Sequence, residues 1–142
     1  MKLSDYLYYP AVIVEEDHGY IINIRDWPGT FSQADTFDEA VDMAYSLILD
    51  MATFYVQDNK EIPHGLKAQK DDVVIDIPYD IAIKFMLRNA MREEHYRPID
   101  LSKKLGITPQ KLNQDLGFTR KTKLDTIASL FKAIGRSLSI EC

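Results

Sequence analysis

The strongest constraint on the fold of this chain is a change in the spacing of its apolar residues near Tyr79. Before that point, short β-branched runs alternate with turn residues, and one longer segment repeats apolar residues every three or four positions. After it, only the helical spacing remains. Strand side chains repeat with period 2 and helical ones with period 3.6, so the two parts differ in secondary structure. The sequence therefore predicts an α+β protein, with a mixed unit at residues 1–78 and an all-helical unit at residues 79–142.

The first unit is expected to hold strands and one helix in the order β-β-β-α-β. Asp17-His18-Gly19 separates the first two strand runs and is typical of a hairpin turn. Thr36-Phe37-Asp38-Glu39 is a capping box, which predicts a helix that runs to about Asn59. Strands are expected at residues 9–16, 20–25, 30–33 and 73–78. This order predicts a sheet with one face covered by the helix.

The second unit contains the pattern of a helix-turn-helix. Helices are expected at residues 79–93, 99–105, 109–116 and 123–134. Leu101 and Leu105 share one face of a short helix, and Gly106 supplies the turn. Thr108 then serves as the N-cap of the next helix and Pro109 as its first residue. In such motifs the second helix enters the major groove of DNA by its N-terminal residues.

Residues on and after that second helix are the candidates for DNA contact. Gln and Asn can pair with adenine edges and Lys with guanine, while the basic residues that follow suit phosphates. The candidates are Thr108, Pro109, Gln110, Lys111, Asn113, Gln114, Arg120, Lys121 and Lys123. Asp115 fits the motif poorly, because that position is often apolar. The alternative interpretation is a plain helical hairpin whose outer charges are only solvated.

Charge is divided unequally between the two units. Residues 1–78 carry 5 Lys and Arg against 15 Asp and Glu, a net charge of −10, and residues 79–142 carry 12 against 7, a net charge of +5. A basic surface can approach nucleic acid, whereas an acidic one is repelled by it and suits a basic protein. Two different partners are therefore expected.

Several classes of protein are disfavoured. No apolar run approaches the ~20 residues that span a bilayer, and the first residues lack a signal-peptide pattern, so we expect a cytoplasmic protein without membrane contact. Cys142 is the only cysteine, and the three histidines fit no zinc spacing, so neither metal nor cofactor is expected. Glu15 and Glu16 point to opposite faces of their strand, unlike the converging carboxylates of a nuclease. We expect a binding protein without catalytic residues rather than an enzyme.

The order and spacing of several short motifs resemble the HicB antitoxin family over nearly the whole chain. The motifs are Tyr9-Pro10, Gly19-Tyr20, Trp27-Pro28-Gly29, Gln33-Ala34-Asp35-Thr36, Asp38-Glu39-Ala40, Ile62-Pro63 and Ile77-Pro78, followed by the helix-turn-helix. Thr30 stands where the family often has Cys, and Ala34 where it often has Gly. The resemblance implies a partial ribonuclease-H-like fold without its catalytic carboxylates, joined to a DNA-binding domain. It also implies that the partner is HicA, a small basic mRNA-cleaving ribonuclease toxin, and that the complex represses its own operon.

On this interpretation residues 1–78 bind the toxin and residues 79–142 bind the operator DNA. Candidate toxin contacts are Glu16, Asp17, Tyr20, Asp26, Trp27 and Asp35. For Trp27 two roles stay open, an aromatic anchor at the interface or packing over the hairpin beside Pro28. The alternative function is a ligand-sensing helix-turn-helix transcription regulator.

A homo-oligomer, dimer or tetramer, is also expected. One helix-turn-helix buries too little surface to hold an operator tightly, and two-fold dimers read paired half-sites. The candidate contacts between copies are the tail Ser137–Ile140 and the apolar face formed by Leu124, Ile127, Leu130, Phe131 and Ile134. The alternative role of that face is the core of the small helical unit.

Overall fold

The computed structural model describes residues 2–138 and confirms the α+β class and the expected order of elements. The short 3-10 helix η1 (Leu3–Tyr6), which the sequence did not indicate, precedes β1 (Tyr8–Glu16), β2 (Gly19–Ile24) and β3 (Phe31–Ala34). Then come α1 (Phe37–Gln57), β4 (Val73–Asp76) and α2 (Tyr79–Glu93). The chain continues with α3 (Pro98–Leu105), α4 (Pro109–Leu116) and α5 (Leu124–Ala133). None of the helices within residues 2–138 has both the length and the apolar character that a membrane crossing needs.

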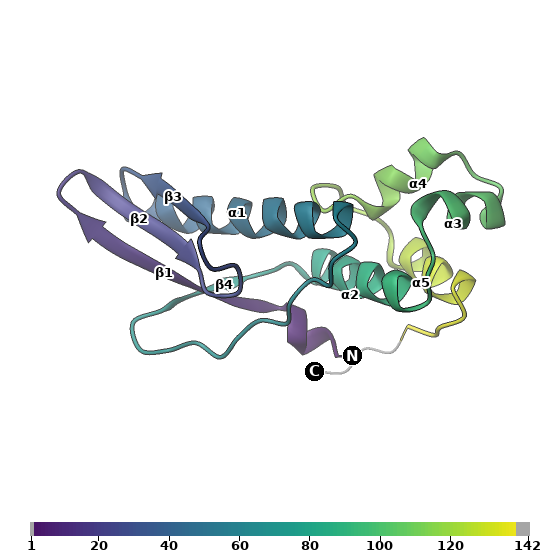
Figure 1. Cartoon of the computed structure of the whole chain (residues 1–142), viewed down its shortest axis with the longest axis horizontal. Coiled ribbons are helices and arrows are strands. Elements are labelled where there is room, and N and C mark those ends of the chain that lie inside the picture. Colours follow the sequence, from purple (N-terminus) through teal and green to yellow (C-terminus); the bar gives the residue numbers. More distant parts are fainter. Residues whose placement is uncertain (1, 139–142) are drawn as a thin grey trace.

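The four strands form one antiparallel sheet in the order β3-β2-β1-β4, and α1 lies along one face of it (Figure 1). The β1–β2 hairpin turns at Gly19, whose φ of +127° favours glycine. A Cβ there would lie 2.5 Å from the carbonyl oxygen of Ala34 on β3. The tight approach of β3 to the hairpin turn therefore requires a glycine at this position.

The helix α1 begins where the capping signal predicts. The Thr36 hydroxyl accepts a hydrogen bond from the Glu39 backbone N–H at 3.2 Å, which satisfies one of the free donors of the first turn. Its sheet-facing side is built largely from small residues, among them Ala40, Ala44 and Ala52, which let the helix approach the strands closely. Phe37, the first residue of α1, is exposed and contacts Tyr20 edge to face.

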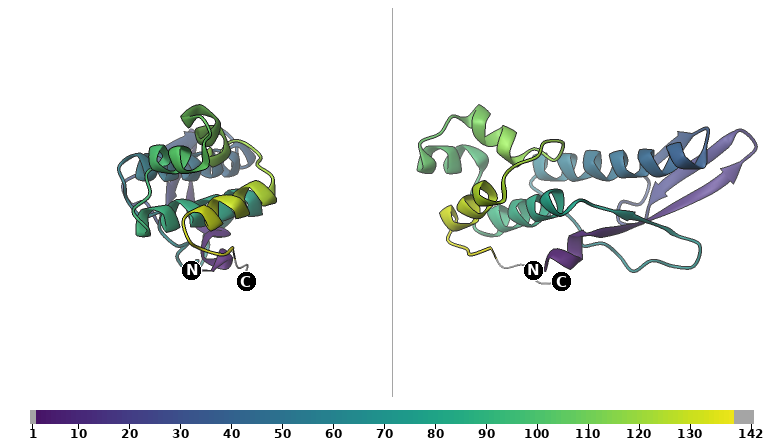
Figure 2. Two further views of the ribbon diagram at one scale, coloured as in Figure 1. Left: turned by 90° about the vertical axis from the view of Figure 1, so that its right-hand side faces the viewer. Right: turned by 180° about the vertical axis from the view of Figure 1, so that it is seen from behind.

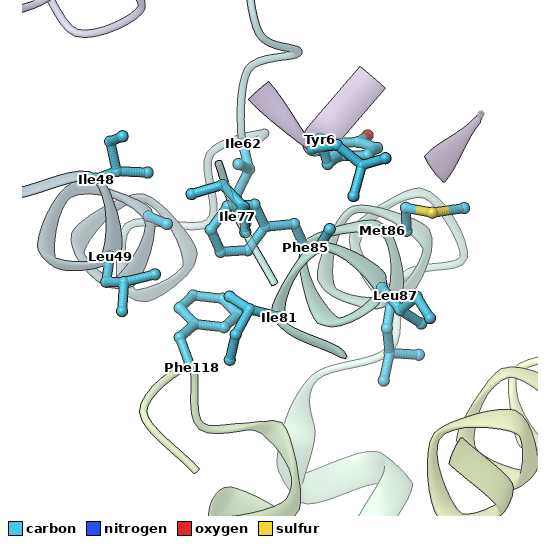
Figure 3. Close-up of a cluster of buried hydrophobic side chains, with 14 of the residues drawn as sticks. Tyr6, Ile48, Leu49, Ile62, Ile77, Ile81, Phe85, Met86, Leu87 and Phe118 are labelled. Carbon is cyan, nitrogen blue, oxygen red and sulfur yellow. The ribbon is translucent and has the colours of Figure 1, made fainter. Parts of the chain in front are cut away.

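The helix α2 is the centre of the molecule. Every residue from 81 to 87 is buried, so this stretch of α2 is packed on all sides. The Phe85 ring contacts Tyr9 of β1, with centroids 6.2 Å apart. It also meets Phe118, beyond α4, edge to face at 4.8 Å (Figure 3). One buried cluster thus joins strands and C-terminal helices. The expected boundary at residue 78 passes through a shared core.

Asn89 ties the N-terminal segments to α2 from inside that core. Its side-chain oxygen accepts from the Ile62 N–H at 2.8 Å, and its amide nitrogen donates to the Ile62 carbonyl and to the Tyr6 hydroxyl, both at 2.9 Å. All three partners are buried, so the amide satisfies polar groups that water cannot reach. The η1 helix and the chain that follows α1 are thereby fixed to α2.

The C-terminal helices form the expected helix-turn-helix. Gly106 adopts the left-handed conformation at φ +67° between α3 and α4, and the Thr108 hydroxyl caps α4 by accepting the Lys111 N–H at 3.1 Å. Figure 2 shows α5 beside α2, beneath α3 and α4. Ile127 and Phe131 of α5 are buried against this bundle.

The apolar face of α5 is therefore core, which corrects its expected role between copies. Ile127, Leu130, Phe131 and Ile134 are buried, whereas Leu124 is 51% exposed. In the tail, Ser137 is exposed and Leu138 packs on the core. The remainder of the expected tail contact, Ser139 and Ile140, lies outside the described residues.

Candidate nucleic-acid interface and acidic face

The exposed side of α4 brings several of the predicted DNA-contacting residues together. Gln110, Asn113 and Gln114 line a shallow, open hollow with Thr119 and Arg120 of the following loop. Thr108 and Pro109 are exposed at the start of α4, and Lys121 and Lys123 are exposed on the segment that leads to α5. Amide side chains and basic groups thus share one accessible surface, as base-edge and phosphate contacts require.

The residue that fits the motif poorly, Asp115, has a partner on its own helix. Its carboxylate is 2.8 Å from the Lys111 ammonium one turn earlier, and its side chain is largely buried. An i,i+4 pair of opposite charge stabilises a helix, so the carboxylate is accommodated without breaking α4. Lys111 is consequently held along the helix axis, and it reaches a base edge only if this ion pair opens.

The loop after α4 is held by a buried lysine that the sequence interpretation missed. Lys84 of α2 has no exposed surface, and its ammonium donates to the carbonyl oxygens of Gly117 and Arg120 at 2.7 Å and 2.6 Å. Burial lowers the pKa of Lys84, while the Asp80 and Asp115 carboxylates oppose that change. The two bonds fix the loop that presents Arg120. The available signal was a single cation within the apolar run Ile81–Leu87.

The β1–β2 hairpin lies at the opposite end of the molecule from α4 (Figure 1), and acidic residues gather around its turn. Glu16 and Asp17 are exposed at the hairpin turn, and Asp35 is exposed beyond β3. Asp35 also lines a hollow of about 440 Å³, together with Glu39 and Asp42 of α1. The other described residues around this hollow are His18, Gln33, Ala34, Met43 and Ser46, so the part of its lining that the structure describes contains no lysine or arginine. Sequence reasoning placed Glu39 only in a helix cap and did not select Asp42.

Only part of the predicted toxin-binding set gathers at this acidic end. Tyr20, half-buried, pairs with Ala34 of β3 beside the hairpin turn, near Glu16, Asp17 and Asp35. Asp26 and Trp27 follow the other end of β2. A six-residue strand is roughly 20 Å long, so these two residues cannot share a small surface with the hairpin turn.

Trp27, for which two roles were open, is a core residue. Its side chain is 1% exposed, stacks on Tyr9 with centroids 5.5 Å apart, and meets Tyr55 of α1 edge to face at 5.9 Å. This burial supports the alternative interpretation, packing over the hairpin. The ring fills the angle between the sheet and α1 and does not reach a partner.

Asp26 is also drawn inward. One carboxylate oxygen accepts the Leu66 N–H at 2.9 Å, and the other is buried without a donor among the described residues. Burial raises the pKa of Asp26 to about 6, with the backbone hydrogen bonds acting in the opposite direction. The carboxylate therefore stabilises or destabilises the fold according to pH, and it contributes little accessible negative charge.

The sheet face turned away from α1 carries exposed apolar side chains. Val14 of β1 lies opposite Ile21 of β2, and Phe31 of β3, 67% exposed, lies opposite Asn23. We call Val14, Ile21 and Phe31 the open-face patch. Apolar side chains grouped beside charged ones are typical of protein interaction surfaces. Val14 and Ile21 lie two positions from Glu16 and Gly19, the pair that closes the hairpin. This part of the patch therefore adjoins the acidic hairpin end.

Comparison with known proteins gives concordant matches. The family model described as the HicB-like antitoxin of bacterial toxin–antitoxin systems matches residues 8–86, from β1 into α2. Antitoxin HicB 2 of Photorhabdus laumondii is 29% identical over 138 residues, which cover 97% of this chain and 98% of that protein. Antitoxin HicB of Escherichia coli K12 is 28% identical over 133 residues, 93% of this chain and 96% of that protein. These alignments extend over the C-terminal helices that the family match leaves out.

Proposed function

The chain belongs to the HicB-like antitoxin family, and on that premise we propose that it neutralises a HicA-type mRNA-cleaving toxin and represses its own operon. Its place as the antitoxin of a toxin–antitoxin system follows from the family. The observation that carries the finer proposal is the position of two chemically opposite surfaces at the two ends of one packed molecule (Figure 1). The protein acts by binding in this proposal, and no catalytic residue is assigned.

The toxin is proposed to bind at the acidic hairpin end. The hollow lined by Asp35, Glu39 and Asp42 offers carboxylates to a basic ribonuclease, and the open-face patch offers apolar contact on the other face of the sheet, across its edge strand β3. Complementary charge mainly raises the association rate, while buried apolar contact mainly slows dissociation. The two features together supply both parts of a tight inhibitory complex. Phe31, rather than Trp27, is the aromatic residue available for the second part.

Operator DNA is proposed to bind at α4. Gln110, exposed in the first turn, is placed to read base edges, and Arg120 and Lys121 are placed to contact phosphates. Two copies of α4 would read two half-sites, so a homodimer or tetramer is part of the proposal. Light scattering on the full chain at tens of micromolar tests this, since modest interfaces already associate in that range. A monomer at that concentration contradicts it.

The toxin assignment is tested by co-expression of the full chain with the small basic open reading frame beside its gene, followed by pull-down and toxicity rescue. The variant Glu39→Lys/Asp42→Lys reverses two charges in the hollow and is expected to slow association and reduce rescue. Asp50→Lys changes an exposed acid of α1 outside the hollow and serves as the matched control. The full chain is used because both units share one core.

Two results decide between parts of this surface. If Glu39→Lys/Asp42→Lys associates with the toxin as fast as Asp50→Lys does, the hollow is not the toxin site. Phe31→Ser is expected to leave the association rate nearly unchanged and to accelerate dissociation. Toxin neutralisation by a variant that lacks both the hollow charges and Phe31 would contradict the whole assignment.

A further inference from the structure

A further cleft is lined by residues from the end of α1, the second half of α2 and the start of α3. These three segments meet at one place in the fold (Figure 1). Its volume is about 470 Å³, within the range of sites that hold small molecules. The charged residues around it are all basic: Lys60, Arg88, Arg92 and Arg97, with His95 beside them. Among residues 2–138, no aspartate or glutamate lines it. It is separate from the acidic hollow and from the exposed side of α4.

Arg88 is the residue of this cleft whose charge is not accounted for. It lies in the middle of α2, mostly buried, and makes no hydrogen bond or ion pair within residues 2–138. Burial alone lowers its pKa, with no opposing carboxylate. A recessed guanidinium with five unused donors costs free energy unless a partner compensates for it. An anion in the cleft would supply that partner.

The neighbouring charges are already explained by contacts within the protein. Arg92 donates to the Asn59 carbonyl at 2.9 Å, which neutralises the end of α1, and Arg97 pairs with Asp100 at 3.0 Å. Glu93 and Glu94, the acids nearest in sequence, pair with Arg136. Neutralisation of helix ends thus explains Arg92 and does not explain Arg88, which binds no carbonyl.

We propose that this cleft binds the phosphate groups of a small phosphorylated molecule of the nucleotide class. Arg88 and Arg92 are four residues apart on one face of α2, so two guanidinium forks can address one polyphosphate. Tyr96, half-buried at the side of the cleft, supplies aromatic surface for a base. A concave site with a recessed arginine favours a compact, multiply charged ligand over duplex DNA, whose backbone meets protruding side chains.

The position of the cleft connects it to the proposed DNA surface. Arg88 also borders an adjoining hollow that contains Asn113 of α4 and Gly117 of the loop held by Lys84. A ligand that orders Arg88 therefore acts on a residue that also borders α4 and its following loop. If the ligand changes operator affinity, the operator must change ligand affinity by the same factor. This inference does not depend on the identity of the toxin.

The test is calorimetric titration of the full chain with pyrophosphate, ATP and adenosine, each compared with sulfate at equal ionic strength. Pyrophosphate and ATP are expected to bind more tightly than sulfate, and adenosine weakly. Arg88→Met keeps an unbranched apolar stem and removes the charge, and is expected to lose roughly tenfold or more in affinity. Arg92→Met, at the exposed edge, is expected to lose several-fold without risk to the core. Lys103→Met, an exposed cation outside the cleft, is the matched control.

Three results would overturn the proposal. The first is pyrophosphate and ATP that bind no better than sulfate. The second is a folded Arg92→Met whose affinity equals that of Lys103→Met. The third is that the phosphates bound by the cleft belong to the operator backbone and not to a nucleotide. If Arg88→Met and Arg92→Met weaken cognate and scrambled duplexes alike in the absence of nucleotide, while nucleotides fail to bind, the cleft holds DNA phosphates instead.

Discussion

Replacement of Asp26 by Asn tests whether a buried carboxylate destabilises this fold at neutral pH. The side chain follows β2, where one oxygen accepts the Leu66 N–H at 2.9 Å and the other is buried without a donor among the described residues. Burial raises the pKa of Asp26 from 3.8 to about 6. Asn keeps an acceptor for the Leu66 N–H and cannot ionise. The variant therefore removes the charge while leaving the known hydrogen bond in place.

The sign follows from proton binding. The pKa of Asp26 is higher in the folded chain than in the unfolded one, so the folded state holds more protons between about pH 4 and pH 6. The stability that protonated Asp26 contributes is complete below the unfolded pKa and is lost as pH rises through the folded pKa. One pKa unit corresponds to about 1.4 kcal/mol, so the raised pKa changes the free energy of unfolding by at most about 3 kcal/mol. Because the side chain is only half-buried, solvent screening reduces this to about 2 kcal/mol.

The assay is urea unfolding of wild type and Asp26→Asn at pH values from 4 to 8. The free energy of unfolding of Asp26→Asn minus that of wild type is expected to rise by about 2 kcal/mol across this interval. Any packing cost of the amide is independent of pH and cancels in the slope. A difference that stays flat across the interval would refute the reasoning.

Asp72→Asn serves as the control, because the pKa of Asp72 is shifted in the opposite direction from that of Asp26. The pH dependence of its unfolding free energy should therefore differ. The Asp72 carboxylate accepts two hydrogen bonds from the Arg25 guanidinium at 2.6 Å and 2.8 Å, which lower the pKa of Asp72. Its stabilisation is present above the unfolded pKa and lost as pH falls through the folded pKa. Asp72→Asn should therefore destabilise at pH 7, by about 1–3 kcal/mol for a partly buried charge pair, and lose that effect only in acid below about pH 4.

Three further outcomes follow from the contacts described above. Gln110→Ala should cost ~1–3 kcal/mol of binding free energy on the cognate operator and little on scrambled DNA. Lys121→Ala should weaken binding to both duplexes and reduce the slope of log affinity against log salt by about one. Equal weakening of both duplexes by Gln110→Ala would show that the assigned register of α4 is wrong. Lys84→Met removes both hydrogen bonds to the loop after α4, so it should lower the unfolding free energy by about 2 kcal/mol and weaken binding to both cognate and scrambled DNA. An unchanged urea midpoint would contradict the role of Lys84. Asn89→Leu leaves three buried polar groups without partners and should destabilise by about 3 kcal/mol in urea, more than the exposed control Asn113→Leu.

Secondary structure was predictable from the sequence because its signals are local. Thr36 and Thr108 cap the helices that they were expected to cap, and Gly106 turns the chain where two apolar repeats meet. Each of these signals depends on residues within four positions of one another. The helix-turn-helix was therefore recognisable before any tertiary contact was known.

The sites were less predictable, because they depend on contacts between distant segments. The acidic hollow combines Asp35, just after β3, with Glu39 and Asp42 from α1, and only the packing of helix on sheet brings them together. Trp27 was ambiguous because a tryptophan beside a turn can be a surface anchor or a core residue. Its burial is decided by Tyr55, 28 positions later on α1. Arg88 gave no signal at all, since one arginine on a long helix is ordinarily solvated.

The net charge of −5 is compatible with a DNA-binding surface once the charges are placed in space. The helix α1 runs from Asp42, in the acidic hollow, to Val56. Val56 borders a different hollow, which Asn113 of α4 also lines. Fourteen residues of α-helix separate these points by about 20 Å, at 1.5 Å per residue. The Debye length at physiological ionic strength is only about 8 Å, so the acidic end is screened from DNA at α4. DNA binding is then governed by nearby groups such as Arg120 and Lys121, and charge reversal at Glu39 and Asp42 should leave the affinity for operator DNA unchanged.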